Sequence, residues 1–259
     1  MPSELLSERD GTTLVLTLNG PETRNTLSEQ LITAGIEALG IAEADRQIRA
    51  IVLRGAGGHF CAGGNLQGLM ARREAGRAAQ AKMLELLHRW IEAVRSIPKP
   101  VVAAVEGAAA GAGFSLALAC DLVVAAEDAR FMLSHAKLGL SPDGGATWQL
   151  ARALPRALAQ QLVWLAEPVS ARQLEQWGLV NVVTDSGQAL AEALRVAQRL
   201  AAMAPNAIAS GKELLQAANA GMLATQLAAE RDHFIENLFH ANAAEGIQAF
   251  LDKRAPRFE

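Results

Sequence analysis

Apolar residues follow two different periods along the chain, and each period predicts one kind of element. Short β-branched runs predict strands, and they lie at residues 12–19, 50–55, 101–105, 121–126 and 179–184. Apolar positions three and four apart predict helices over 26–45 and 79–97. In the first of these helices, Thr26 and Glu29 have the spacing of a capping box. Strand, glycine-rich loop and helix alternate in this part of the chain, which is typical of an α/β architecture.

Beyond residue 150 the pattern becomes almost entirely helical. We therefore expect an α/β core over residues 1–200 and a helical C-terminal region over 201–259. The last helices carry apolar faces with little local core to cover them. Those apolar residues are Leu214, Leu215, Met222, Leu223, Leu227, Phe234 and Leu238. Uncovered faces of this size mark interfaces, so we expect a homotrimer or homohexamer.

Composition excludes several classes of partner. Apolar residues make up 51% of the 259 residues, and the formal net charge is -3. The sequence contains no block of Lys and Arg, so we expect neither a nucleic-acid nor a membrane partner. Cys61 and Cys120 lie in no C-x-x-C pair and near no cluster of metal ligands, which favours free thiols in a reducing compartment. No signal-like segment or run of ~18 apolar residues is present, and we expect a cytoplasmic protein.

Two glycine-rich segments are candidate binding loops. "HFCAGGNL" spans 59–66 and "GAAAGAGF" spans 107–114, where it leads into a predicted helix. Glycines permit positive φ and a close approach of the backbone, and a helix N-terminus offers unpaired N–H donors. Taken alone, the first segment is explained better by an ordinary tight turn, and the second is explained equally well by close helix–strand packing.

Asp143 can likewise be a structural or a functional residue, because it lies in "SPDGG" between a proline and two glycines. Aspartate is a common turn residue, and it is also the simplest general base. His135 lies eight residues earlier. Taken alone, the local sequence favours the turn residue.

Six segments in order resemble the crotonase (enoyl-CoA hydratase/isomerase) superfamily, and together they cover nearly the whole chain. They are "NGPETRNTLS", "FCAGGNL", "IPKPVVAAVEGAAAGAGFSLALACDLVVAAEDARF", "LGLSPDGGATWQLAR", "ARQLEQWGLVNVV" and "FLDKRAPRF". The resemblance implies a spiral of β–β–α units with a C-terminal helical trimerisation region. It also implies an acyl-CoA thioester as substrate, with coenzyme A as part of that substrate, no other cofactor and no metal.

The resemblance further implies an oxyanion hole made by the backbone N–H groups of Gly64 and Ala112. Two fixed donors at the thioester oxygen would stabilise an enolate by several kcal/mol. Ala62 would lie near the adenine of coenzyme A. Four basic residues are candidate phosphate contacts, the last three of them from a neighbouring subunit: Arg24, Lys253, Arg254 and Arg257.

The chain departs from the hydratase pattern at both catalytic glutamates, whose positions hold Ser115 and His135. Asp143 remains, and isomerase branches of the superfamily use an aspartate there. "GLSPDGGATW" is most similar to the ring-1,2-epoxyphenylacetyl-CoA isomerase-like branch. We therefore expect an enoyl-CoA or ring-epoxide aryl-CoA isomerase with Asp143 as the acid/base, because a double-bond shift needs only one proton carrier.

Three alternatives stay open. The resemblance also extends to 4-chlorobenzoyl-CoA dehalogenases, in which the aspartate is a nucleophile. In those enzymes a histidine twelve residues before the proline of the "KP-V" strand activates water. Here His88 lies twelve residues before Pro100. Enoyl-CoA hydratase activity is the second alternative, with Ser115 or His135 as possible catalytic groups. A non-catalytic acyl-CoA binder is the third, because both glutamates are missing.

Overall fold

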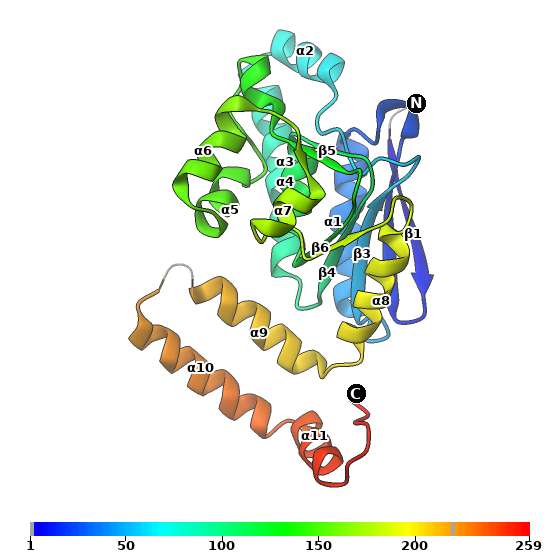
Figure 1. The fold of residues 1–259 in the computed structure, drawn as a ribbon, viewed down its shortest axis with the longest axis vertical. Helices are drawn as coiled ribbons and strands as arrows, with labels where there is room; N and C mark the ends of the chain where they lie inside the picture. Colours follow the sequence, from blue (N-terminus) through cyan, green and yellow to red (C-terminus); the bar gives the residue numbers. More distant parts are fainter. Residues whose placement is uncertain (1–2, 219–220) are drawn as a thin grey trace.

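A computed structural model describes residues 3–218 and 221–259, and its centre is a six-stranded sheet (Figure 1). The strand order is β1-β2-β3-β4-β6-β9, and only the β1–β2 pair is antiparallel. The strands of this sheet are β1 (Glu4–Asp10), β2 (Thr13–Asn19), β3 (Ala50–Gly55), β4 (Val101–Val105), β6 (Leu122–Ala126) and β9 (Val182–Thr184). The four longer predicted strands are confirmed, while β9 is shorter than the predicted run.

A second, three-stranded sheet has the order β5-β7-β8 and consists of β5 (Ala108–Ala110), β7 (Arg130–Met132) and β8 (Val169–Ser170). From β4 to β7 the strands alternate between the sheets: β4 and β6 lie in the large sheet, and β5 and β7 follow them in the small one. Helix α4 (Ala112–Ala119) follows β5 and completes one β–β–α unit. This repeated crossing is the crotonase spiral.

Helices cover both faces of the large sheet. Strand side chains alternate between the faces, so Leu14 packs into the larger core while its neighbour Val15 packs into the smaller one. The smaller core lies under α8, whose alanines recur every four residues from Ala189 to Ala201. The helices of the core are α1 (Glu29–Ala44), α2 (Leu66–Ala75), α3 (Arg77–Ser96), α4, α5 (Ala146–Ala153), α6 (Arg156–Leu165), α7 (Ala171–Gln176) and α8 (Ala189–Ala201).

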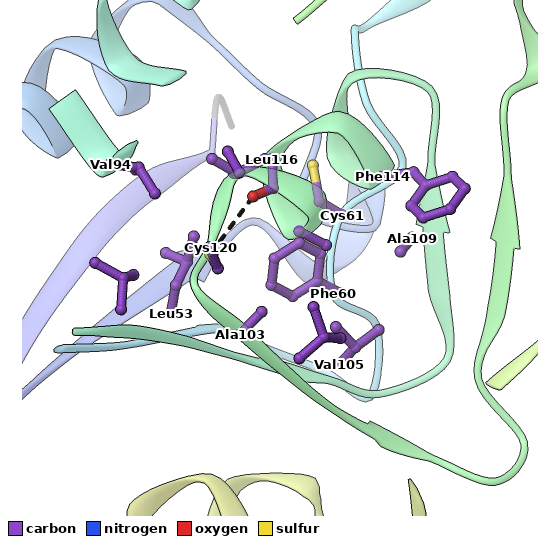
Figure 2. Packing of buried hydrophobic residues seen from close by; sticks show 14 of the residues in the cluster. Leu53, Phe60, Cys61, Val94, Ala103, Val105, Ala109, Phe114, Leu116 and Cys120 are labelled. Atoms are coloured by element: carbon purple, nitrogen blue, oxygen red, sulfur yellow. Dashed lines mark hydrogen bonds between the residues drawn. The ribbon is translucent and has the colours of Figure 1, made fainter. Parts of the chain in front are cut away.

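The larger core continues beneath the two glycine-rich segments. Figure 2 shows Phe60 and Cys61 of the first segment beside Ala109 and Phe114 of the second. Both cysteines are free and buried, as predicted. Burial raises the pKa of the Cys61 thiol to about 12, and the Cys120 thiol donates to the Leu116 carbonyl at 3.5 Å. Neither thiol is therefore a reactive group.

The predicted capping box is wrong. Helix α1 begins at Glu29, and its N-cap is Ser28, whose hydroxyl accepts from the Leu31 N–H at 3.1 Å. Strand β1 was not predicted, because its residues are mostly polar and exposed. It lies at the edge of the sheet, where only one neighbour, β2, is needed to pair its backbone.

Three further helices extend away from the core (Figure 1): α9 (Pro205–Ala218), α10 (Leu223–Leu238) and α11 (Ala241–Leu251). Several of their large apolar side chains are exposed, including Leu223, Leu227 and Phe234. In the described chain, helix α9 contacts the core through Lys212, whose ammonium lies 2.8 Å from the Asp121 carboxylate. None of the described helices is long and apolar enough to cross a membrane.

Candidate active site

A cavity of about 640 Å³ lies between α2, α3 and the two glycine-rich segments. Its wall brings together six of the residues singled out in the sequence: Ala62, Gly64, His88, Ala112, His135 and Asp143. The rest of the lining is mainly apolar and includes Leu69, Met83 and Leu87. An apolar cavity with a few polar groups is the usual form of a small-molecule site.

Two backbone N–H donors lie in this wall. Ala112 is the first residue of α4, where the helix supplies no carbonyl partner for its N–H. Gly64 follows Gly63, whose carbonyl accepts from the Leu27 N–H at 2.8 Å and so fixes the loop against the start of α1. Both residues line the cavity. The arrangement is suited to holding an oxygen that gains negative charge.

Two glycines allow the loops to approach each other. A Cβ on Gly63, which has φ +86°, would lie 2.6 Å from the Ala110 carbonyl oxygen and 3.1 Å from the Ala112 nitrogen. A Cβ on Gly113 would lie 2.3 Å from the Cys61 carbonyl oxygen. The spacing of the two donors therefore depends on the absence of side chains at these positions.

Asp143 also lines the cavity and lies three residues before α5. Its carbonyl accepts from the Ser115 hydroxyl at 2.9 Å and from the Ala146 N–H at 3.2 Å. Ser115 is fully buried on α4, and a Cβ on Gly144 would lie 2.8 Å from the Ser115 Cβ. The contact therefore fixes the backbone of Asp143 to the helix that carries Ala112.

The Asp143 side chain contacts His135. Its Oδ1 lies 3.3 Å from His135 Nε2, and the carboxylate side chain is 27% exposed. His135 is almost fully buried in the short 3-10 helix Ser134–Leu138. The chain turns back after this helix because the Leu140 N–H donates to the His135 carbonyl at 2.9 Å.

The cavity continues past Asp143. A second cavity of about 490 Å³ shares His88, Pro142 and Asp143 with the first and is also lined by Trp148. The guanidinium groups of Arg95 and Arg152 lie 4.6 and 4.0 Å from the centre of the Trp148 ring. Asp143 is therefore close to open space on two sides.

The sequence profile of the enoyl-CoA hydratase/isomerase family matches residues 8–259. The chain belongs to this family. It is 36% identical over 255 residues to 1,2-epoxyphenylacetyl-CoA isomerase of Escherichia coli K12, covering 98% of this chain and 97% of that protein. It is 37% identical over 257 residues to 2,3-dehydroadipyl-CoA hydratase of the same organism, covering 99% of each.

Comparison with solved structures supports the same family. An enoyl-CoA hydratase from Polaromonas sp. JS666 is 56% identical and superposes with a TM-score of 0.98, covering 99% of this chain and 100% of that one. The chain is thus an acyl-CoA enzyme of the crotonase superfamily, and its relatives carry both isomerase and hydratase names.

The predicted phosphate contacts of this family member are only partly near the cavity. Arg24 is adjacent, because its carbonyl accepts from the Ala62 N–H at 2.9 Å. Lys253, Arg254 and Arg257 follow α11 and are not among the residues that line the cavity. The Arg254 guanidinium is bound to the Glu245 carboxylate at 2.7 Å and lowers the pKa of that group to about 2. A single chain therefore does not bring these three residues to the site.

Asn25 was not predicted from the sequence to support the site. Its side chain has no surface exposure, and its backbone has a left-handed φ of 59°. Its amide donates to the carbonyls of Ala56, His59 and Phe60 at 2.8, 2.7 and 3.3 Å. Its oxygen accepts from the Gly20 N–H at 3.0 Å. Asn25 thus holds the first glycine-rich segment in place. The only local signal was an asparagine in a turn-forming segment, which does not predict bonds to residues more than thirty positions away.

Proposed function

We propose that the chain is an isomerase of an enoyl-CoA or a ring-epoxide aryl-CoA, with Asp143 as the acid/base. The observation that carries the proposal is that Asp143 is the carboxylate in the cavity wall that also holds the Gly64 and Ala112 N–H groups. The two positions where hydratases have glutamates hold Ser115, which is bonded to backbone carbonyls, and His135.

The reaction follows from these groups. The carboxylate takes a proton from a carbon next to the polarised system, and the electron pair moves onto the thioester oxygen. The N–H groups of Gly64 and Ala112 stabilise that enolate oxygen, and removing one such donor typically costs about 3–4 kcal/mol. With an enoyl-CoA, the proton on Asp143 then returns to a different carbon, so the double bond shifts and no water is consumed. Coenzyme A enters as part of the substrate, and no further cofactor is needed.

Asp143→Asn tests the role of the carboxylate, because the amide keeps the shape and removes the base. We expect turnover of vinylacetyl-CoA, or of whichever member of an enoyl-CoA and aryl-CoA panel reacts fastest, to fall ~10²–10⁴-fold. Binding of the thioester, measured by calorimetry, should be retained. Turnover near that of the native protein would show that Asp143 is a turn residue only. If the native protein converts no member of the panel, a non-catalytic acyl-CoA binder becomes the better hypothesis.

A dehalogenase-like hydrolase is a second candidate, because His88 and Asp143 line the same two cavities. In that reaction the Asp143 carboxylate attacks the aromatic ring, halide leaves, and water activated by His88 hydrolyses the aryl ester. His88→Gln should then accumulate an aryl-enzyme adduct on incubation with a halogenated aryl-CoA. Intact-protein mass spectrometry should detect no adduct if the isomerase reading is correct.

We also propose that the functional unit is a homotrimer or homohexamer. The exposed apolar residues of α9–α11 support it, and so does the absence of Lys253, Arg254 and Arg257 from the lining of their own chain's cavity. In such an assembly these cations would reach the phosphates of a thioester bound to a neighbouring subunit.

A further inference from the structure

We propose that His135 is the positioning residue of Asp143, donating its Nε2–H to Oδ1 so that the other carboxylate oxygen faces the acyl group. This inference rests on the proposed role of Asp143 as the acid/base. Only 7% of His135 is exposed, and its Nε2 lies 3.3 Å from Asp143 Oδ1. Among the described residues, this is the only side-chain hydrogen bond of the Asp143 carboxylate.

The surroundings of the imidazole decide which nitrogen carries the proton. Nδ1 is buried and has no hydrogen-bond partner among the described residues. An ionised carboxylate only accepts hydrogen bonds. A proton on Nδ1 alone would leave a buried N–H unpaired, which costs about 1–3 kcal/mol, and would place the Nε2 lone pair against a carboxylate oxygen. The Nε2–H form satisfies the contact.

The ring also lies close to the loop of the oxyanion donors. A Cβ on Gly111 would lie 3.8 Å from both Cε1 and Nε2 of His135. Gly111 directly precedes Ala112 and is held by its own N–H, which donates to the Met132 carbonyl at 2.9 Å. One buried side chain therefore spans the base and the loop that polarises the thioester. Together with the Ser115 contact, it fixes both the backbone and the side chain of Asp143.

This geometry suits positioning better than proton transfer. Nδ1 has no partner that could pass on a proton, and the imidazole side chain is only 9% exposed, against 27% for the carboxylate. Three other charged or titratable side chains line the cavity from α2, α3 and the 3-10 helix, namely Arg72, His88 and Lys137. The buried imidazole is the group that orients the carboxylate.

The test compares His135→Leu, which removes the donor, with His135→Gln, whose amide nitrogen can occupy the place of Nε2. The readouts are the isomerisation of vinylacetyl-CoA and the exchange of the α-protons of phenylacetyl-CoA with D2O. Exchange needs only the base and the polarising donors. A misplaced catalytic group can cost about 10²-fold, so we expect His135→Leu to lower kcat and the exchange rate 10–10²-fold. KM should change little, and His135→Gln should restore most of the rate.

Combining His135→Leu with Asp143→Asn shows whether His135 acts through Asp143 or independently of it. If His135 acts through Asp143, His135→Leu should cause no further loss there. An equal loss in both backgrounds, or equal losses in the Leu and Gln variants, would overturn the inference. Failure of the proposed function gives a different result, because Asp143→Asn itself would then remain active. If His135→Leu does not fold, His135→Asn, whose amide is too short to reach Oδ1, takes its place.

Discussion

Replacing Asn25 by Asp should destabilise the protein far more than its small change in shape suggests. The side chain is fully buried, and its amide nitrogen donates to three carbonyl oxygens of the 56–60 segment. Asn25→Asp puts a carboxylate oxygen in the place of that nitrogen. Three donor–acceptor contacts then become contacts between acceptors, in a position that water does not reach.

The expected loss of stability follows from the three hydrogen bonds that Asn25 donates. Each net hydrogen bond is worth about 1 kcal/mol, and an unsatisfied buried polar group costs about 1–3 kcal/mol. Two of the three bonds are short, at 2.7 and 2.8 Å, and the third is 3.3 Å. We expect a loss of about 4 kcal/mol at neutral pH. For a chain of this size 1 kcal/mol shifts Tm by about 2–4 °C, so Tm should fall by about 8–16 °C.

Thermal unfolding followed by circular dichroism, at one fixed protein concentration, measures this loss. Asn65→Asp is the matched control, because Asn65 uses its oxygen to accept from the Gly68 N–H at 2.8 Å at the N-cap of α2. Asn and Asp are equivalent there, so its Tm should change little. The deficit of Asn25→Asp should shrink from pH 8 to pH 5, since the folded state then holds a proton on the buried carboxyl. A Tm within 2 °C of the native protein's would refute the assigned hydrogen bonds.

Three further outcomes are expected. Lys212→Met should lower the free energy of unfolding, measured in urea, by about 2–3 kcal/mol, because it removes the ammonium 2.8 Å from the Asp121 carboxylate. Burial already raises the pKa of that carboxyl. The expected loss is below the usual cost of breaking a buried ion pair because the carboxylate is partly exposed. The loss should grow with pH as the carboxyl ionises, and a loss independent of pH would contradict the pairing. Gly113→Ala should lower Tm and kcat, because its Cβ would overlap the Cys61 carbonyl, whereas Gly40→Ala in α1 meets nothing within 4 Å and should leave Tm unchanged or raise it. Light scattering at micromolar concentration should give the mass of a trimer or hexamer, and a monomeric mass would rule out the proposed assembly.

The buried strands could be predicted from the sequence because their signal is local. Strands such as Val101–Val105 are buried on both faces, so nearly every residue in them is β-branched or small. Strand β1 lacks this signal, because its partner β2 pairs its backbone while its polar side chains face solvent. The two-residue strand β8 is likewise too short to leave a pattern.

The contacts of the site depend on distances that no local pattern contains. His135 and Asp143 are eight residues apart, which is neither a helical nor a strand period. They meet because the Leu140 N–H bonds back to the His135 carbonyl. The bonds of Asn25 depend in the same way on a segment more than thirty residues away. Gly64 and Ala112 could be paired only through the family resemblance, which carries this non-local information.

Helix α2 contains no buried residue, although Leu66, Leu69 and Arg72 line the cavity. The N–H donors and Asp143, in contrast, belong to segments that the two sheets and α4 hold in place. Substitutions on α2 can therefore alter which acyl groups fit while costing the fold almost nothing, since exposed positions typically change stability by about 0.5 kcal/mol or less. Such a division lets substrate preference evolve along one helix without repeated loss of the groups that we propose polarise and deprotonate the thioester.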